Sequence, residues 1–215
     1  MRCIAEAARD IGPCGRAVEG HTLHLGKISV LGMPDEPLLP IDDELLTKPS
    51  ARVDLFDPGI RRLADEMFAI MDREHGAGLA AVQIGRPVRL VVLDTLDEAG
   101  RRHRMAMVNP EIRARSAGQV VGEEGCLSMP GYAIPVPRHE QVTVTFQDLD
   151  GAAQSLVATG PLSVCVQHEV DHTEGVLFFD RVSRLRRQRA KAHFNKVRRR
   201  FVAQAAHGHV PATRR

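Results

Sequence analysis

The sequence predicts an α+β fold, in which short strands surround the helices. Apolar residues recur at helical spacing in three segments, and short strand patterns lie between these segments. With 43% hydrophobic and 26% charged residues, the 215-residue chain can bury the core of one domain. Aromatic residues make up only 4% of the chain, so we expect an aliphatic core and no platform for stacking nucleic-acid bases.

The first helix is predicted to begin at Asp57 and Pro58. These are the residue types of an N-cap and a first helical position. Apolar residues follow at helical spacing, namely Ile60, Leu63, Met67, Ile70 and Met71. Gly76 is expected to end this helix. Residues 1–27 carry no periodic pattern, so we expect a poorly ordered extension before a globular domain over residues 28–180.

Two segments have strand patterns. Residues 88–93, after Pro87, form an almost continuous apolar run, which predicts a strand buried on both faces. Val142, Val144 and Phe146 alternate with polar residues, which predicts a half-exposed strand.

The second helix is predicted between Gly160-Pro161 and Gly175. Its apolar residues cover most of its circumference, which indicates burial on several sides. After Asp180 we expect a third helix, whose apolar stripe consists of Ala190, Phe194, Val197 and Phe201. Residues 181–215 form a basic C-terminal helix and tail with 12 Lys and Arg and no acid, whereas the first 180 residues hold 17 basic and 27 acidic residues, a net charge of −10.

The apolar runs are too short to span a membrane, which needs about 18 residues, and no secretory signal is evident at the N-terminus. The four cysteines are irregularly spaced, which indicates a reducing compartment. An important cysteine is therefore expected to be a metal ligand or a nucleophile.

The second helix contains His168-Glu169-Val170-Asp171-His172, an HExxH motif. Histidines four residues apart lie on one helical face and can bind one metal ion, while the adjacent Glu169 can act as general base. The alternative is a pair of histidines on a solvated, charged turn, but the flanking sequence is apolar.

A catalytic metal usually takes three protein ligands, so one more is needed. Cys165 lies three residues before His168, on roughly the same face, although a small buried cysteine is more often part of the core. Cys126 lies in Glu123–Ser128, followed by Pro130 and Gly131, a run that indicates a turn and not a core strand. Both cysteines remain candidates on these grounds.

Three segments, taken together, form a specific sequence signature. Gly76–Gln83 (GAGLAAVQ), Glu123–Ser128 (EEGCLS) and Gln167–His172 (QHEVDH) resemble, in this order, the three signature motifs of the peptide deformylase family. The resemblance covers about residues 28–180 and extends into Gly175–Arg181 (GVLFFDR). It implies small mixed or antiparallel sheets around a central HExxH helix, with a C-terminal helix.

The resemblance also implies roles for individual residues. The metal ligands would be Cys126, His168 and His172, with Glu169 as catalytic base. The side chain of Gln83 and the backbone N–H of Leu127 would stabilise the oxyanion. The implied substrate-binding residues are Ala77, Gly78, Glu124, Gly125, Pro161, Val164 and Cys165. The implied cofactor is one divalent metal ion per chain, Fe²⁺ in the native protein, with Zn²⁺ or Ni²⁺ as alternatives.

The implied substrate is the N-terminal formylmethionine of nascent polypeptides, and the implied products are formate and a free amine. We expect a monomer, cytoplasmic in a bacterium or organellar in a eukaryote, without membrane or DNA partners.

The basic C-terminal helix resembles, in position and charge, a segment that docks on the ribosome. From motif position we also expect Glu124, Arg138 and Asp171 to form an ionic group that holds the Cys126 loop against the helix.

Two departures from the family pattern bear on specificity. Thr173 follows the HExDH motif where leucine is common, and Ala133 stands where some members carry an arginine that contacts the substrate backbone. They leave two rival readings. One is an amide hydrolase with shifted specificity, and the other is a degenerate ribosome- or RNA-associated protein that keeps the motifs without the activity.

Overall fold

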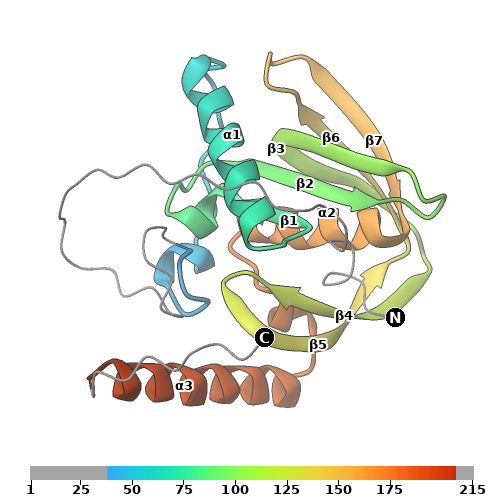
Figure 1. Ribbon diagram of the computed structural model, residues 1–215. Helices are drawn as coiled ribbons and strands as arrows, with labels where there is room; N and C mark the ends of the chain where they lie inside the picture. Colours follow the sequence, from blue (N-terminus) through green and yellow to red (C-terminus); the bar gives the residue numbers. More distant parts are fainter. Residues whose placement is uncertain (1–37, 207–215) are drawn as a thin grey trace.

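The computed structural model describes residues 38–206, in which three α-helices pack with two antiparallel sheets (Figure 1). The helices are α1 (Pro58–Arg73), α2 (Gly160–Thr173) and α3 (Arg184–Ala206). Short 3₁₀ helices are η1 (Glu44–Thr47), η2 (Ala81–Ile84) and η3 (Phe178–Arg181). The predicted α+β class is confirmed. The extension expected over residues 1–27 and the domain start expected near Ile28 lie outside the described residues.

The larger sheet has five strands in the order β1-β2-β3-β6-β7, and each pair is antiparallel. Its strands are β1 (Gly78–Ala80), β2 (Leu90–Leu96), β3 (Arg102–Arg115), β6 (Gln141–Gln147) and β7 (Ala153–Thr159). The smaller sheet is the hairpin of β4 (Gln119–Cys126) and β5 (Met129–His139). The HExxH helix α2 lies between the five-stranded sheet and this hairpin, as Figure 1 shows.

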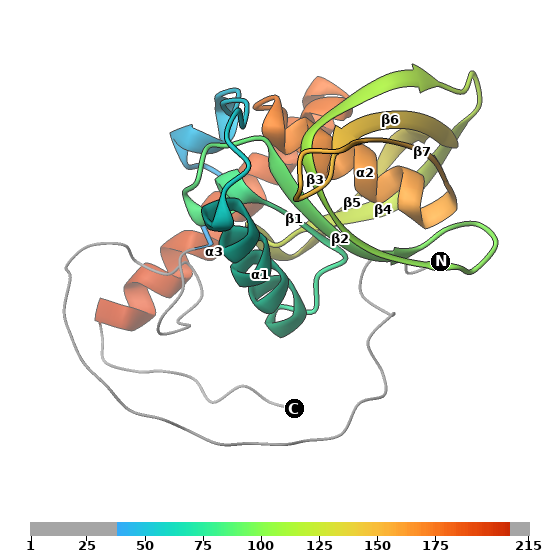
Figure 2. The same ribbon diagram turned by 90° about the horizontal axis from the view of Figure 1, so that it is seen from above.

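The apolar run of β2 follows from the position of this strand, because both faces of the larger sheet are covered there. Val91 and Leu93 belong to the core that contains α2, whereas Leu90 and Val92 belong to the core that contains α1. Figure 2 shows α1 and α2 at different sides of the strands. Strand β6 follows its predicted pattern, since Val142 and Val144 are fully buried between half-buried neighbours.

Helix α1 begins as predicted, because the Asp57 carboxylate accepts hydrogen bonds from the backbone N–H groups of Gly59 and Ile60. Its end differs from the prediction. The left-handed residue that closes the helix is His75, with φ of 54°, and the Gly76 N–H bonds to the Met71 carbonyl. Gly76 is required instead by packing, since a methyl group there would lie 2.8 Å from Leu127 Cδ1.

Helix α2 has the predicted bounds. Gly175, with φ of 74°, donates to the His172 carbonyl, and Val176 donates to the Asp171 carbonyl, which closes the helix in a Schellman motif. Eleven of its fourteen residues are buried, as the apolar circumference predicted. The first residue, Gly160, contacts the turn after β2, where a Cβ would lie 2.9 Å from the backbone nitrogen of Glu98.

Helix α3 runs along the β4–β5 hairpin (Figure 1). Its predicted stripe is buried at Ala190 and Phe194 and half-buried at Val197, while the Phe201 side chain lies outside the described part. His193 stacks on Tyr132 of β5 with ring centroids 4.4 Å apart. Within the described residues, no helix is long and apolar enough to cross a membrane.

Candidate metal centre

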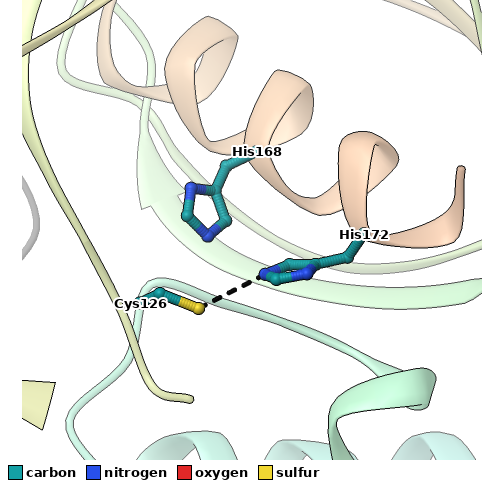
Figure 3. A group of neighbouring side chains, drawn as sticks. All are labelled: Cys126, His168 and His172. Atoms are coloured by element: carbon teal, nitrogen blue, oxygen red, sulfur yellow. Dashed lines mark hydrogen bonds between the residues drawn. The ribbon is translucent and has the colours of Figure 1, made fainter. Parts of the chain in front are cut away.

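Three potential metal ligands meet between α2 and the smaller sheet (Figure 3). His168 and His172 lie one turn apart on α2, and Cys126 is the last residue of β4. One donor atom from each residue lies within 4.8 Å of the others, and Cys126 Sγ is 3.3 Å from His172 Nε2. All three side chains are buried. The structure thus brings together the three residues that the family resemblance implied.

The position of Cys126 is set by the hairpin. The turn consists of Leu127 and Ser128, and Cys126 pairs with Met129 after a register shift that follows Gly125. The turn predicted around Cys126 is wrong for residues 124–126, because they form the end of β4. An ordered strand end fixes the thiol more firmly than a free loop would.

A buried ion network fixes the first histidine. The Arg138 guanidinium donates to both oxygens of Glu124, at 2.7 and 3.0 Å. Glu124 Oε2 lies 2.9 Å from His168 Nδ1, which leaves the Nε2 atom of His168 for a metal. Burial raises the pKa of Glu124, but the contacts with His168 and Arg138 outweigh it and lower the pKa to about 2.

The network continues through the helix to the segment before α3. Arg138 Nη1 donates to Asp171 Oδ2 at 2.6 Å. Arg181 of η3 donates to both oxygens of Asp171, at 3.0 and 2.5 Å. The expected ionic group of Glu124, Arg138 and Asp171 is therefore present, and Arg181 extends it.

The second histidine has the protonation state that a metal ligand needs. Burial, together with the nearby His168 and Arg138, holds the pKa of His172 well below its usual range, so the ring is neutral. Its Nδ1 atom is buried and has no hydrogen-bond partner among the described residues. A thiol and two imidazoles are donors that Fe²⁺ and Zn²⁺ accept, so the residues present fit a divalent transition metal.

Glu169 lies beside this donor set on the next face of α2. Its side chain is buried, and its Oε2 atom has no hydrogen-bond partner within the described part of the chain. Burial raises the pKa of Glu169 to about 7, against the opposing charge of His168. A carboxyl group with this pKa can accept and return a proton near neutral pH.

Gln83 contacts the thiol from the opposite side. Its Nε2 atom lies 3.4 Å from Cys126 Sγ and 3.2 Å from Ser128 Oγ, and its Oε1 atom accepts from the Ala80 N–H at 2.9 Å. The short helix η2 directly after β1 positions this side chain. The carboxamide therefore donates toward the metal centre from a fixed position.

Cys165, the rival third ligand, lies apart from the donor cluster. Its Sγ atom donates to the Ala77 carbonyl at 3.3 Å, and burial, followed by the charges of Glu169 and Glu124, raises its pKa well above the usual range. Both Cys126 and Cys165 are free thiols. The protonated, buried Cys165 packs as part of the core beside Gly78 and Glu169.

The residues expected to bind substrate are not equivalent in the structure. Ala77, Gly78, Gly125, Pro161 and Val164 are half-buried near the N-terminal half of α2 and the hairpin. Glu124 differs, because its side chain is fully buried and both its oxygens are engaged by Arg138 and His168. In this structure the carboxylate supports His168, and its contact with substrate stays a prediction.

The two departures from the family pattern are accommodated. Thr173 is fully buried and donates its hydroxyl to the Val170 carbonyl at 2.8 Å, while its own carbonyl accepts from the Ser50 N–H. Ala133 is exposed on β5, opposite Gly125. Neither residue touches the donor set.

Two participants were not assigned from sequence. Ser128 holds the Gln83 amide, and Arg181 holds Asp171. Both residues lie inside the motif segments EEGCLS and GVLFFDR, and this position within a motif is the signal that the sequence offers for their roles. Their partners lie 45 and 10 residues away, and only the fold shows the contacts.

The fold, with a metal-capable group of one hairpin cysteine and two histidines of an HExxH helix, is typical of metal-dependent hydrolases. The profile of the polypeptide deformylases matches residues 36–188. The chain belongs to the polypeptide deformylase family, whose members are enzymes.

Individual relatives agree with the family match. A peptide deformylase from Rhizobium meliloti (strain 1021) is 41% identical over 173 residues, which are 80% of this chain and 99% of the relative. The crystal structure of a peptide deformylase from Legionella pneumophila matches with a TM-score of 0.69 and 39% identity, over 78% of this chain and 97% of that one. That from Ehrlichia chaffeensis matches with a TM-score of 0.70 and 32% identity, over 75% and 95% of the two chains.

Proposed function

We propose that this chain removes the formyl group from the N-terminal formylmethionine of nascent polypeptides and releases formate. The observation that carries the proposal is the Cys126, His168 and His172 cluster, with its donor atoms within 4.8 Å, beside the unpartnered carboxylate oxygen of Glu169. This is the arrangement that hydrolysis of an amide bond needs, namely a ligand set for an electrophile and a base.

The proposed ligands are Cys126, His168 and His172, and the proposed native metal is Fe²⁺, with Zn²⁺ and Ni²⁺ also compatible with the donors. When bound, the metal supplies a Lewis acid that polarises the formyl carbonyl and activates water. Glu124 and Arg138 hold His168 in the orientation that directs its Nε2 atom to this position.

Glu169 is the proposed general base and acid. Its carboxylate takes a proton from the attacking water as the oxygen adds to the formyl carbon. It then gives that proton to the leaving nitrogen as the C–N bond breaks, which yields formate and a free α-amine. The pKa of about 7 suits both steps near neutral pH.

The proposed donors to the developing oxyanion are the Gln83 side-chain amide and the Leu127 backbone N–H. Gln83 is held by Ala80 and Ser128 before any substrate arrives, so it needs no reorganisation during the reaction. Gln83→Ala should lower kcat by about 100-fold to 1,000-fold. The metal content should be unchanged, because Gln83 is not a ligand. Loss of metal in this variant would show a structural role instead.

The proposed methionine pocket is lined by Ala77, Pro161, Val164 and Cys165, of which the last three lie in the N-terminal half of α2. Small and apolar side chains, with a protonated Cys165 thiol, suit an unbranched thioether side chain. Gly78 is proposed to let the substrate backbone approach, and Glu124 and Gly125 are the other proposed substrate-binding residues.

The decisive experiment is formate release from formyl-Met-Ala-Ser by anaerobically purified protein, with metal content measured on the same sample. Glu169→Gln is the matched control, because it keeps the shape of the side chain and removes the base. We expect turnover that requires both metal and Glu169. Metal without turnover would contradict the formylmethionine substrate, and absence of metal would contradict the metallohydrolase assignment.

A separate proposal concerns where the protein works. We propose a monomer in the bacterial cytoplasm that reaches nascent chains through a ribosome contact of α3. Support comes from bacterial relatives and from α3, a helix with nine Lys and Arg and no acidic residue. Neutralising Arg198–Arg200 should weaken co-sedimentation with ribosomes at low salt, and unchanged co-sedimentation would contradict the contact.

A further inference from the structure

A cavity that opens to solvent lies beside α2, on the flank next to the metal centre. Its volume is about 170 Å³, and it is lined by the end of β3, the outer ends of β4 and β5, α2 and η3. The polar side chains that line it include Arg115, Arg138, His139, Gln167, Asp171 and Arg181. We infer that this cavity binds a small oxyanion, of the size and charge of inorganic phosphate.

The charge around the cavity favours an anion. Three guanidinium groups line it, those of Arg115, Arg138 and Arg181, against the single carboxylate of Asp171. Both oxygens of Asp171 are already occupied by Arg138 and Arg181. Glu124 faces Arg138 from the side of the metal centre, and the charge of Glu174 acts on Arg181, so Arg115 is the guanidinium group that has no carboxylate partner among the described residues.

Hydrogen-bond donors also remain. A guanidinium group has five N–H donors. Arg138 uses one on each of its three nitrogens for Glu124 and Asp171, and Arg181 uses two for Asp171. The side chain of Arg115 has no hydrogen bond or ion pair within the part of the chain that the structure describes, although its backbone pairs with Val142 of β6. Arginine forks are suited to carboxylate and phosphate oxygens.

Size restricts the ligand. A volume of about 170 Å³ exceeds what a single water molecule needs and is on the scale of a compact anion such as phosphate or a small dicarboxylate. The shared chemistry is a compact oxyanion with two or more oxygens that can accept from separate guanidinium groups.

The cavity is separate from the proposed metal centre but connected to it. Gln167 and Asp171 each precede a histidine of the donor set by one residue, so they lie on the adjacent flank of α2. Arg138 lies between the cavity and Glu124, and Glu124 contacts His168. An anion on Arg138 would therefore lie two contacts away from a metal ligand.

The test is isothermal titration of the metal-loaded full chain with inorganic phosphate, at ionic strength held constant with chloride. Arg115→Ala removes one guanidinium from the cavity. Arg113→Ala is the matched control, because it removes the same charge two residues away on β3, where Arg113 pairs with Glu111 outside the cavity. We expect saturable binding that weakens at least fivefold in Arg115→Ala and is unchanged in Arg113→Ala.

Three results would overturn the inference. They are no saturable binding, equal weakening in both variants, or loss of binding when Arg198–Arg200 are neutralised, which would place the phosphate on α3. Phosphate bound directly to the metal would be insensitive to Arg115. Competition by malonate would show that a dicarboxylate uses the same site. Without phosphate, Arg115→Ala should release formate at the same rate as the unaltered protein. A negative phosphate titration would therefore contradict the anion site and leave the proposed function unaffected.

Discussion

Gly78 shows how a single residue determines the geometry of the centre. It lies in β1 where α2 packs closest to the sheet, and a methyl group there would lie 2.6 Å from Glu169 Oε1 and 2.9 Å from Cys165 Sγ. The family resemblance implied that Gly78 binds substrate. The structure adds that its missing side chain makes room for the Glu169 carboxylate.

Gly78→Ala should therefore displace Glu169 while the three metal ligands stay in place. We expect a loss of about 100-fold in kcat, the order that a shift of about 1 Å in a reacting group costs, with the metal content unchanged. Gly122→Ala is the control, because a Cβ at Gly122 meets nothing within 4 Å. Equal kcat in both variants would show that the site tolerates the methyl group.

At the scale of elements, the contact between α2 and the β4–β5 hairpin depends on one arginine. Arg138, only 3% exposed, connects Glu124 of β4 with Asp171 of α2. Without it, Glu124 loses the guanidinium group that binds both its oxygens, and Asp171 keeps only Arg181. Removal of one partner from a buried ion pair typically costs about 3 to 5 kcal/mol.

Arg138→Met should lower the free energy of unfolding by this amount and also reduce the metal content, because Glu124 no longer holds His168. Denaturant titration and metal analysis measure the two effects. Arg113→Ala, which breaks an exposed pair with Glu111, should change neither. Full metal content in Arg138→Met would contradict the role assigned to the network.

A second element contact joins the turn after β2 to the start of α2. Asp97 accepts hydrogen bonds from His103, from the Arg101 backbone N–H and from the Arg101 side chain, and the adjacent Glu98 backbone packs on Gly160. The contact with His103, followed by that with Arg101, holds the pKa of Asp97 well below its usual value of 3.8. The turn is therefore tied down by an ionised carboxylate.

A lowered carboxyl pKa stabilises the folded protein above the pKa of the unfolded chain, and this stabilisation is lost as the pH falls through the folded pKa. Asp97→Asn should thus be less stable than the unaltered protein near pH 7, and the two should converge as the pH falls below 3.8. Guanidinium denaturation of the metal-free proteins measures this. Asp65→Asn, on the exposed face of α1, should match the unaltered protein in free energy of unfolding both near pH 7 and at acid pH.

At the scale of the whole molecule, the proposed metal joins two layers. Its ligands come from α2, which packs on the five-stranded sheet, and from the hairpin on the other side of that helix (Figure 1). A ligand that binds only the folded state stabilises it by about 4 kcal/mol when its concentration is about 1,000 times Kd. Metal binding should therefore stabilise the assembly of both layers.

Treatment with a chelator should lower the Tm of the unaltered protein and of Cys165→Ala, but not that of Cys126→Ala, which lacks a ligand. Differential scanning calorimetry with and without chelator provides the comparison. A chelator effect that disappears in Cys165→Ala and persists in Cys126→Ala would reverse the assignment of the two cysteines.

The sequence by itself predicted the α+β class, the three helices, N-terminal signals for the first two of them, the strands at Leu90 and Val142, and the HExxH pair. These are local features, since helical spacing, caps and strand alternation are properties of neighbouring residues. The motif resemblance added Cys126, Gln83 and the Glu124, Arg138 and Asp171 group.

Only the tertiary structure decided what depends on contacts between distant residues. It placed residues 124–126 in a strand and showed that Glu124 contacts His168. It separated Cys165 from the donor set, added Arg181 to the network, and brought Arg115 and Arg181 around one cavity. The physical reason is that burial, pKa and ion pairing depend on which segments pack together, and residues far apart in the chain carry no local signal of their partners.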